Sequence, residues 1–153
     1  MHSKIEHLNA DEQSLVLNAP LLVTALISGA DGEFTNEEIQ QAVKIIHIKS
    51  YKESKEVSGV YKTIDLQTED SIQMLISALP ESTLERNQML QTQLSGLNAI
   101  FPKLDQQFAY DLFQSLKQLA FYVSTAGDLG VGVQSQQEKD MARLSFLNAP
   151  EQP

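Results

Sequence analysis

Apolar residues recur along this chain with the spacing of α-helices. In several segments they return every three or four positions, and only the short stretch 131–133 hints at extended backbone. The clearest stripe predicts one long helix and consists of Leu104, Phe108, Leu112, Leu116, Leu119 and Val123. We therefore predict an all-α fold, a compact bundle of about seven helices.

Two of these helices carry clear signals at their ends. Pro20 suits the first position of a helix, where its missing N–H costs nothing, and the residues after it are apolar on nearly every side. A helix of that kind belongs in the middle of a bundle. Gly32 is the better left-handed terminator for it. Thr35 and Glu38 then form a capping box that predicts the start of the next helix.

The remaining helices are predicted from similar signals. Residues 49–63 are polar and predict partial helix with a weak point at Ser58-Gly59. Thr68 is predicted to cap a helix that Pro80 ends, and residues 82–101 repeat the pattern up to Pro102. A glycine-rich loop follows the long helix, and Ser135 is predicted to open a last helix that runs through Leu147.

Composition indicates one cytoplasmic domain. The chain has 153 residues, 42% of them hydrophobic, which fits a single domain over residues 1–153 with flexible ends at 1–10 and 149–153. No apolar run approaches the roughly 20 residues of a membrane span, and the N-terminus has no apolar signal segment. Cysteine is absent, which excludes disulfides and thiolate ligands and fits a reducing compartment.

Charge limits the partners that we expect. The net charge is −9, and the field of such a chain repels nucleic acid. One stretch is locally basic and contains Lys44, Lys49, Lys52, Lys55 and Lys62. We interpret this stretch as a solvated helix face rather than a docking site for an acidic protein.

The segment "ALISGADGEFTNEEI", residues 25–39, places four acids between two apolar stretches. A similar sequence, "FYVSTAGDLGVGVQSQQE", follows the long predicted helix, so that Asp128 corresponds to Asp31 and Glu138 to Glu38. The separation within each acid pair is seven residues in the first copy and ten in the second. We interpret the two segments as a degenerate internal repeat with pseudo-twofold symmetry.

The repeated acids have two interpretations. Glu38 fits a capping role, but Asp31 in the last turn of a helix opposes the helix dipole unless a cation lies beside it. A pseudo-twofold axis would bring the two pairs together, so the candidate metal ligands are Asp31, Glu38, Asp128 and Glu138. Oxygen ligands without cysteine favour Ca²⁺ or Mg²⁺ over Zn²⁺. An EF-hand is excluded, because its sixth and twelfth positions would be Asn36 and Ala42.

The stretch "ADGEFTNEE" at the end of an apolar helix resembles the ADGxxxxxE signature of the TerB-like proteins, the tellurite resistance family. This resemblance implies a cytoplasmic all-helical domain with pseudo-twofold repeats. It also implies divalent metal binding by acidic residues at helix junctions, and a role in the response to tellurite or related stress. The match covers residues 25–46, whereas "AGDLGVGVQSQQE" departs in glycine placement and loop length.

We therefore expect a non-enzymatic, TerB-like helical domain that binds a divalent metal ion or a protein partner. A first alternative is a metal-free protein–protein interaction module that uses apolar grooves and the basic stretch. A second alternative is a hydrolase with Asp31 and Glu38 as an acid/base pair. We disfavour it, because Glu38 already serves as a cap and no G-x-S-x-G nucleophile setting occurs.

Overall fold

The computed structural model describes residues 4–30, 32, 34–124 and 143–153, and all regular secondary structure among them is helical. In chain order the α-helices are α1 (Ala10–Ser28), α2 (Asn36–Lys52), α3 (Lys55–Ile64), α4 (Thr68–Ala78), α5 (Thr83–Ser95), α6 (Leu97–Ile100) and α7 (Gln106–Ser124). Two 3₁₀ turns lie between helices: η1 (Asp65–Gln67) between α3 and α4, and η2 (Phe101–Lys103) between α6 and α7. The predicted all-α class is confirmed.

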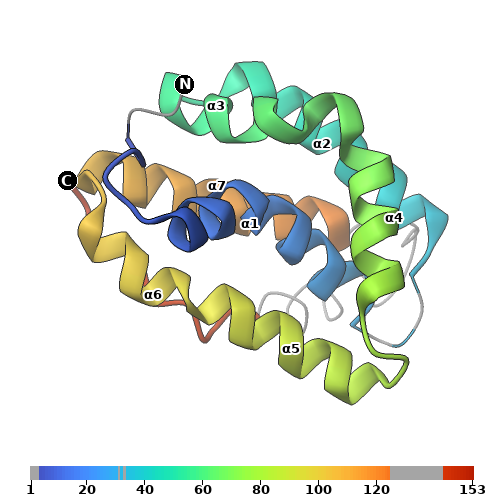
Figure 1. The fold of residues 1–153 in the computed structure, drawn as a ribbon. Coiled ribbons are helices and arrows are strands. Elements are labelled where there is room, and N and C mark those ends of the chain that lie inside the picture. Colours follow the sequence, from blue (N-terminus) through green and yellow to red (C-terminus); the bar gives the residue numbers. More distant parts are fainter. Residues whose placement is uncertain (1–3, 31, 33, 125–142) are drawn as a thin grey trace.

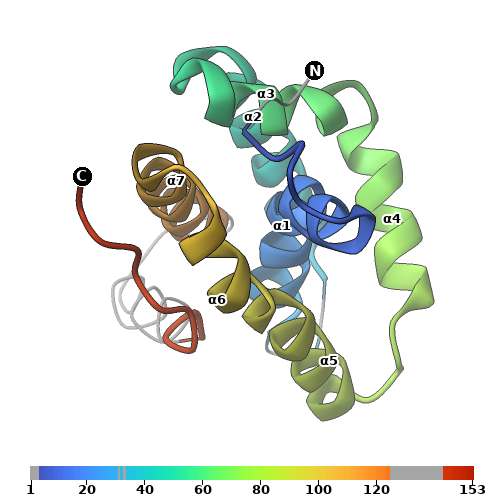
Figure 2. The ribbon, with the colours of Figure 1, turned by 60° about the vertical axis from the view of Figure 1, so that its left-hand side comes forward.

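Helices α1 and α7 form the centre of the bundle. Figure 1 shows them between the α2–α3 pair on one side and α5–α6 on the other, with α4 closing one end. In the rotated view α1 lies between α7 and α4, with α5 below it (Figure 2). Helix α1 contacts α2, α3, α4, α5, α6 and α7, so it is the hub of the core.

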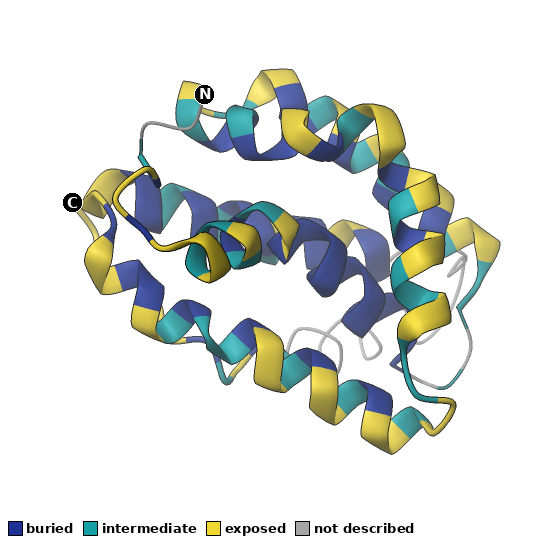
Figure 3. Cartoon of the chain, viewed as in Figure 1, coloured by how far each residue is buried: buried dark blue, intermediate teal, exposed yellow. Residues whose placement is uncertain are grey.

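Burial follows the predicted stripes closely. The C-terminal half of α1 is buried all round, from Ala19 to Ser28, which confirms its predicted place in the middle (Figure 3). On α7 the whole predicted stripe from Phe108 to Val123 is buried, and Leu104 joins it. None of the described helices has the length and hydrophobicity needed to cross a membrane.

The predicted start of the first helix is wrong. Helix α1 begins at Ala10, because Asn9 and Glu12 form a capping box: Asn9 Oδ1 accepts from the Glu12 N–H at 2.8 Å, and Glu12 Oε1 accepts from the Asn9 N–H at 3.1 Å. Pro20 lies inside the helix, where tight burial offsets the one missing backbone hydrogen bond.

The end of α1 combines two glycines. The helix stops at Ser28 and Gly29 is the C-cap, with φ −100°. Gly32 has φ +109°, which agrees with the predicted left-handed residue, although it follows the helix end rather than forming it.

Two further predicted boundaries are wrong. Helix α3 continues through Gly59, and the chain breaks earlier, around Ser54, because the Ser58 hydroxyl accepts from the Glu53 N–H at 3.1 Å and holds the break in place. Thr68 does not cap α4: its hydroxyl donates to the Ile64 carbonyl at 2.9 Å, and α4 continues directly from η1.

The C-terminal part of the chain is only partly described. The predicted opening of the last helix at Ser135 and the glycine-rich loop lie outside the described residues, and the described residues 143–147 form turns instead of helix. The pseudo-twofold repeat and the count of about seven helices stay predictions. So does the flexibility of residues 1–10 and 149–153, although Ile5 and Leu8 are buried in the core.

Candidate functional site

The junction between α1 and α2 holds the first predicted acid pair. Glu38 lies in the first turn of α2, where Thr35 Oγ1 accepts from the Glu38 N–H at 3.2 Å and donates to Glu38 Oε1 at 2.7 Å. Thr35 is therefore the N-cap of α2, which confirms the prediction. Asp31, Asp128 and Glu138 lie outside the described residues, so the predicted four-carboxylate site remains a prediction.

The backbone on both sides of Asp31 is anchored by α5. Arg86 Nη2 donates to the carbonyl oxygens of Gly29 and Gly32 at 3.1 and 3.2 Å, and Asn87 Nδ2 donates to that of Ala30 at 3.3 Å. These side chains add donors to carbonyl groups at and just beyond the end of α1, where the Gly29 carbonyl also accepts from the Gly32 N–H at 3.1 Å. The positive charge of Arg86 also complements the negative end of the α1 dipole.

Phe34 completes this anchor. The Arg86 guanidinium lies over the Phe34 ring, 4.6 Å from its centroid, and Arg86 is 6% exposed. The ring packs so closely on Gly29 that an added Cβ there would come within 2.4 Å of it. Sequence reasoning missed this role of Arg86, because nothing local to residue 86 indicates a partner more than fifty residues earlier in the chain.

The anchor limits how a metal ion would bind at the junction. Two junction carbonyls already accept from a guanidinium, so a cation would depend on carboxylates. Outside residues 1–3, 31, 33 and 125–142, no three His, Asp or Glu side chains are grouped to hold a metal. The disfavoured Asp31/Glu38 acid/base pair likewise depends on Asp31, whose position is not described.

In comparisons with known proteins, no family model, curated protein or solved structure matches the chain. The resemblance to the TerB-like proteins therefore stays a prediction from the segment at residues 25–46.

A groove of about 890 Å³ opens to solvent among the described helices, and we call it the α1–α4–α5 groove. One face of α1 forms its floor, and residues of α3, η1, α4 and α5 form its sides. The lining residues are Asp11, Ser14, Leu15, Asn18, Leu21, Leu22, Thr63, Ile64, Gln67, Ser71, Met74, Leu75 and Gln93. Most of the lining surface is apolar, with amides and hydroxyls interspersed.

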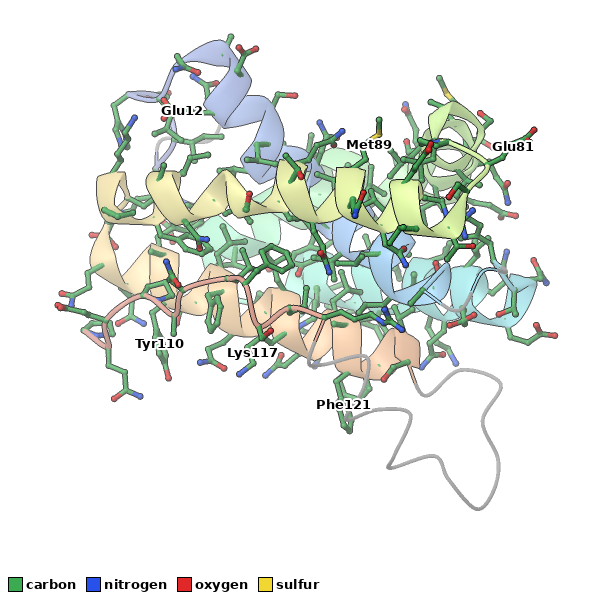
Figure 4. The ribbon with its side chains drawn as sticks, turned by 90° about the horizontal axis from the view of Figure 1, so that it is seen from below. Glu12, Glu81, Met89, Tyr110, Lys117 and Phe121 are labelled. Atoms are coloured by element: carbon green, nitrogen blue, oxygen red, sulfur yellow. The ribbon has the colours of Figure 1, made fainter. Side chains whose placement is uncertain are left out.

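Met74 lines this groove, Met89 lies one helical turn from its lining residue Gln93, and both methionines are exposed to solvent. Met74 of α4 is 72% exposed, and Met89 of α5, one turn before the lining residue Gln93, is 40% exposed. In Figure 4 Met89 projects from α5 on the side that carries α4 and the beginning of α1, opposite to Lys117 and Phe121 of α7. The groove therefore has an apolar interior with adaptable apolar side chains at its edge.

A cluster of polar side chains is buried between α2, α3 and α7. Lys49 Nζ donates to Glu53 Oε1 at 2.5 Å and to Gln118 Oε1 at 2.9 Å. Ser115 Oγ donates to Glu53 Oε1 at 2.7 Å and shares a hydrogen bond of 2.9 Å with the Tyr61 hydroxyl. Lys49, Tyr61 and Ser115 are all buried, so this cluster joins three helices rather than meeting a substrate.

This cluster corrects the predicted solvated face of the basic stretch. Lys49 is only 6% exposed, because Glu53 and Gln118 satisfy its ammonium group inside the bundle. Burial also raises the pKa of the Tyr61 phenol above its ordinary value, and the bond to Ser115 only partly opposes this. Lys52 and Lys62 are exposed, as the prediction expects of them.

Proposed function

We propose that this chain is a non-enzymatic binding domain that holds an apolar segment of another protein in the α1–α4–α5 groove. The observation that carries the proposal is the groove itself: about 890 Å³, open to solvent, and lined mainly by apolar surface. Concave apolar surface with a few convergent polar groups is typical of binding sites.

Helix α4 supports this proposal. Of its eleven residues only Thr68 and Ile72 are buried, while Leu75 and Ile76 are partly exposed and Met74 is largely exposed; Leu79, just after the helix, is partly exposed too. Exposed apolar side chains gathered beside a groove mark interaction surfaces more often than scattered ones do. A partner segment in the groove would cover Met74 and Leu75 without any rearrangement of the core.

A peptide library tests the proposal. We would select a phage-displayed library of random peptides on the whole chain and retest the enriched peptides on the variant M74Q/M89Q. Peptides held in the groove lose binding to this variant, because the exposed apolar edge is gone. Y51Q is the matched control, since Tyr51 is 57% exposed on α2. If no enriched peptide depends on Met74 and Met89, the groove is not a binding site.

A second candidate function is divalent metal binding at the α1–α2 junction. It is supported by the resemblance to the TerB-like family and by the anchored backbone around Asp31, with Glu38 at the start of α2. The internal repeat would bring Asp128 and Glu138 beside this pair, and Ca²⁺ or Mg²⁺ fits carboxylate ligands better than Zn²⁺ does. The role in tellurite or related stress and the cytoplasmic location belong to this proposal.

Calorimetry separates the second candidate from the first. Titration of the whole chain with millimolar Ca²⁺, Mg²⁺ or Mn²⁺ is expected to release or absorb heat and to raise the melting temperature. Asp31→Asn is expected to remove most of this rise in melting temperature. Asp128→Asn does the same if both copies contribute ligands. If none of the three ions gives heat or a thermal shift, Glu38 serves only as a cap and Asp31 needs no cation.

A further inference from the structure

The shape of the α1–α4–α5 groove selects an elongated occupant. On α1 the lining residues fall on one helical face and extend from Asp11 to Leu22. Eleven steps of a helix cover about 16 Å, so the groove floor is about three turns long. A partner helix of about three turns matches this length.

The charged side chains at the groove are all acidic. Asp11 is the single charged residue among the lining residues. Helical spacing places two more exposed acids next to the exposed methionines, Asp70 four residues before Met74 and Glu85 four residues before Met89. The groove edge is therefore acidic on α1, α4 and α5.

The nearby basic residues do not neutralise this edge. Lys62 on α3 lies about 100° around the helix axis from Thr63 and about 160° from Ile64, the two α3 residues that line the groove. Lys103 is paired with Glu12, with Nζ 2.6 Å from Oε2, and this contact lowers the pKa of that carboxyl. The net charge of −9 adds attraction for a cationic partner at long range.

From this shape and charge we infer that the groove binds a basic amphipathic helix of a partner protein, with apolar residues at positions i, i+3, i+4 and i+7. The inference rests on the proposed function as an interaction domain and specifies its partner. The apolar face lies on Leu15, Leu22 and Leu75, and Lys or Arg side chains lie beside Asp11, Asp70 and Glu85. Methionines at the edge adapt to helices of different sequence.

Three synthetic peptides test the inference on the whole chain. They share one apolar face and carry Lys, Gln or Glu on the polar face, and fluorescence anisotropy measures their affinity. We expect the Lys peptide to bind at least tenfold more tightly than the Glu peptide, with a difference that shrinks as salt is added. Equal affinity of the Gln or Glu peptide for the groove overturns the inference but leaves the proposed function intact.

Two pairs of variants locate the bound peptide. M74Q/M89Q should weaken the Lys peptide at least threefold, with Y51Q as its control. D11N/D70N should weaken it similarly, whereas E56Q/D111N, which removes the same charge from α3 and α7, should change it little. A Lys peptide that binds all four variants alike lies elsewhere and overturns the inference. If no peptide depends on Met74 and Met89, the proposed function fails as well.

A membrane surface is the other class of occupant that an apolar groove accepts, and sedimentation with anionic phospholipid vesicles measures it. The acidic edge predicts no binding to such vesicles. Binding that M74Q/M89Q abolishes would overturn the inference in favour of a lipid surface.

Discussion

At the scale of single residues, hydrogen bonds at helix ends determine where the chain turns. Asn9, Thr35 and Ser82 each accept from the N–H three residues later and begin α1, α2 and α5. Arg86 performs the complementary task at the end of α1, where it donates to the carbonyls of Gly29 and Gly32. Caps of both kinds therefore lie on the two sides of the α1–α2 junction.

Replacement of the α2 cap is expected to lower stability. Thr35→Ala removes the hydroxyl that accepts from the Glu38 N–H, and the usual loss for such a cap is about 1 kcal/mol. The midpoint of urea unfolding measures this loss. Thr92→Ala, on the exposed face of α5, is the control and should change the midpoint little. An unchanged midpoint for Thr35→Ala would mean that the cap does not contribute.

Tyr61 is expected to make the fold sensitive to alkali. Its phenol has a pKa raised by burial, so the folded state holds the proton more tightly than the unfolded state, where the pKa is about 10. This contribution is complete below about pH 10 and is lost as the pH rises further. The midpoint of urea unfolding should therefore fall from pH 8 to pH 11.

Tyr61→Phe separates this effect from other groups that titrate in the same range. At pH 8 the variant should be about 1 kcal/mol less stable, because it lacks the hydrogen bond to Ser115. Between pH 8 and pH 11 its free energy of unfolding should fall by less than that of the unmodified chain. Parallel curves for the two proteins would show that Tyr61 does not cause the alkaline loss.

At the scale of elements, α1 serves both the core and the groove. From Ala19 onward it is buried on every side, and it packs against helices throughout the bundle. Before that point it presents Asp11, Ser14, Leu15 and Asn18 to the groove. The groove continues onto the buried part of the helix, where Leu21 and Leu22 line it, so α1 supports the core and also forms the groove floor.

Shortening a side chain in the buried half is expected to be costly. Leu26 is 0% exposed, so Leu26→Ala should lower the free energy of unfolding by about 2–5 kcal/mol, through lost burial and the cavity left behind. Leu84→Ala, at a position that is 67% exposed, is the matched control and should cost less than about 0.5 kcal/mol. Chemical denaturation of both variants measures the difference, and a loss near zero for Leu26→Ala would contradict its place in the core.

At the scale of the whole molecule, the C-terminal segment crosses back over the bundle. Asn98 Nδ2 donates to the Phe146 carbonyl at 2.9 Å, and the Asn148 N–H donates to Asn98 Oδ1 at 2.8 Å. Leu144 and Leu147 are buried beside these bonds. The Asn98 carboxamide therefore fixes the backbone of the segment against α6, and Gln152 bonds it to Gln106 and Tyr110 of α7.

Loss of this carboxamide is expected to loosen the segment. Asn98→Ala removes two hydrogen bonds of about 1 kcal/mol each, so the Asn148 amide should exchange with solvent at least tenfold faster. Amides in the middle of α7 should keep their protection, and Asn18→Ala provides a control on the exposed part of α1. Unchanged exchange at Asn148 would mean that burial of Leu144 and Leu147 suffices.

In the candidate site at the α1–α2 junction, the sequence predicted the hydrogen bonding on the α2 side. The capping role of Thr35 at Glu38 was readable, because both partners lie within four residues of each other. The anchor formed by Arg86 was not, since its acceptors are 54 and 57 residues away in the chain. The groove could not be predicted from the sequence either, because its floor and its sides come from helices that meet only after folding.

What the sequence by itself determined was the helical class, the buried stripe of α7 and the central place of α1, since periodicity and hydrophobicity are local properties. The start of α1 was also present in the sequence, in the Asn9/Glu12 box. Only the tertiary structure decided that Lys49 is buried, because its acceptor Gln118 comes from α7. It alone decided that α4 leaves Met74 exposed beside α1, since the packing of helices distant in sequence determines which faces remain uncovered.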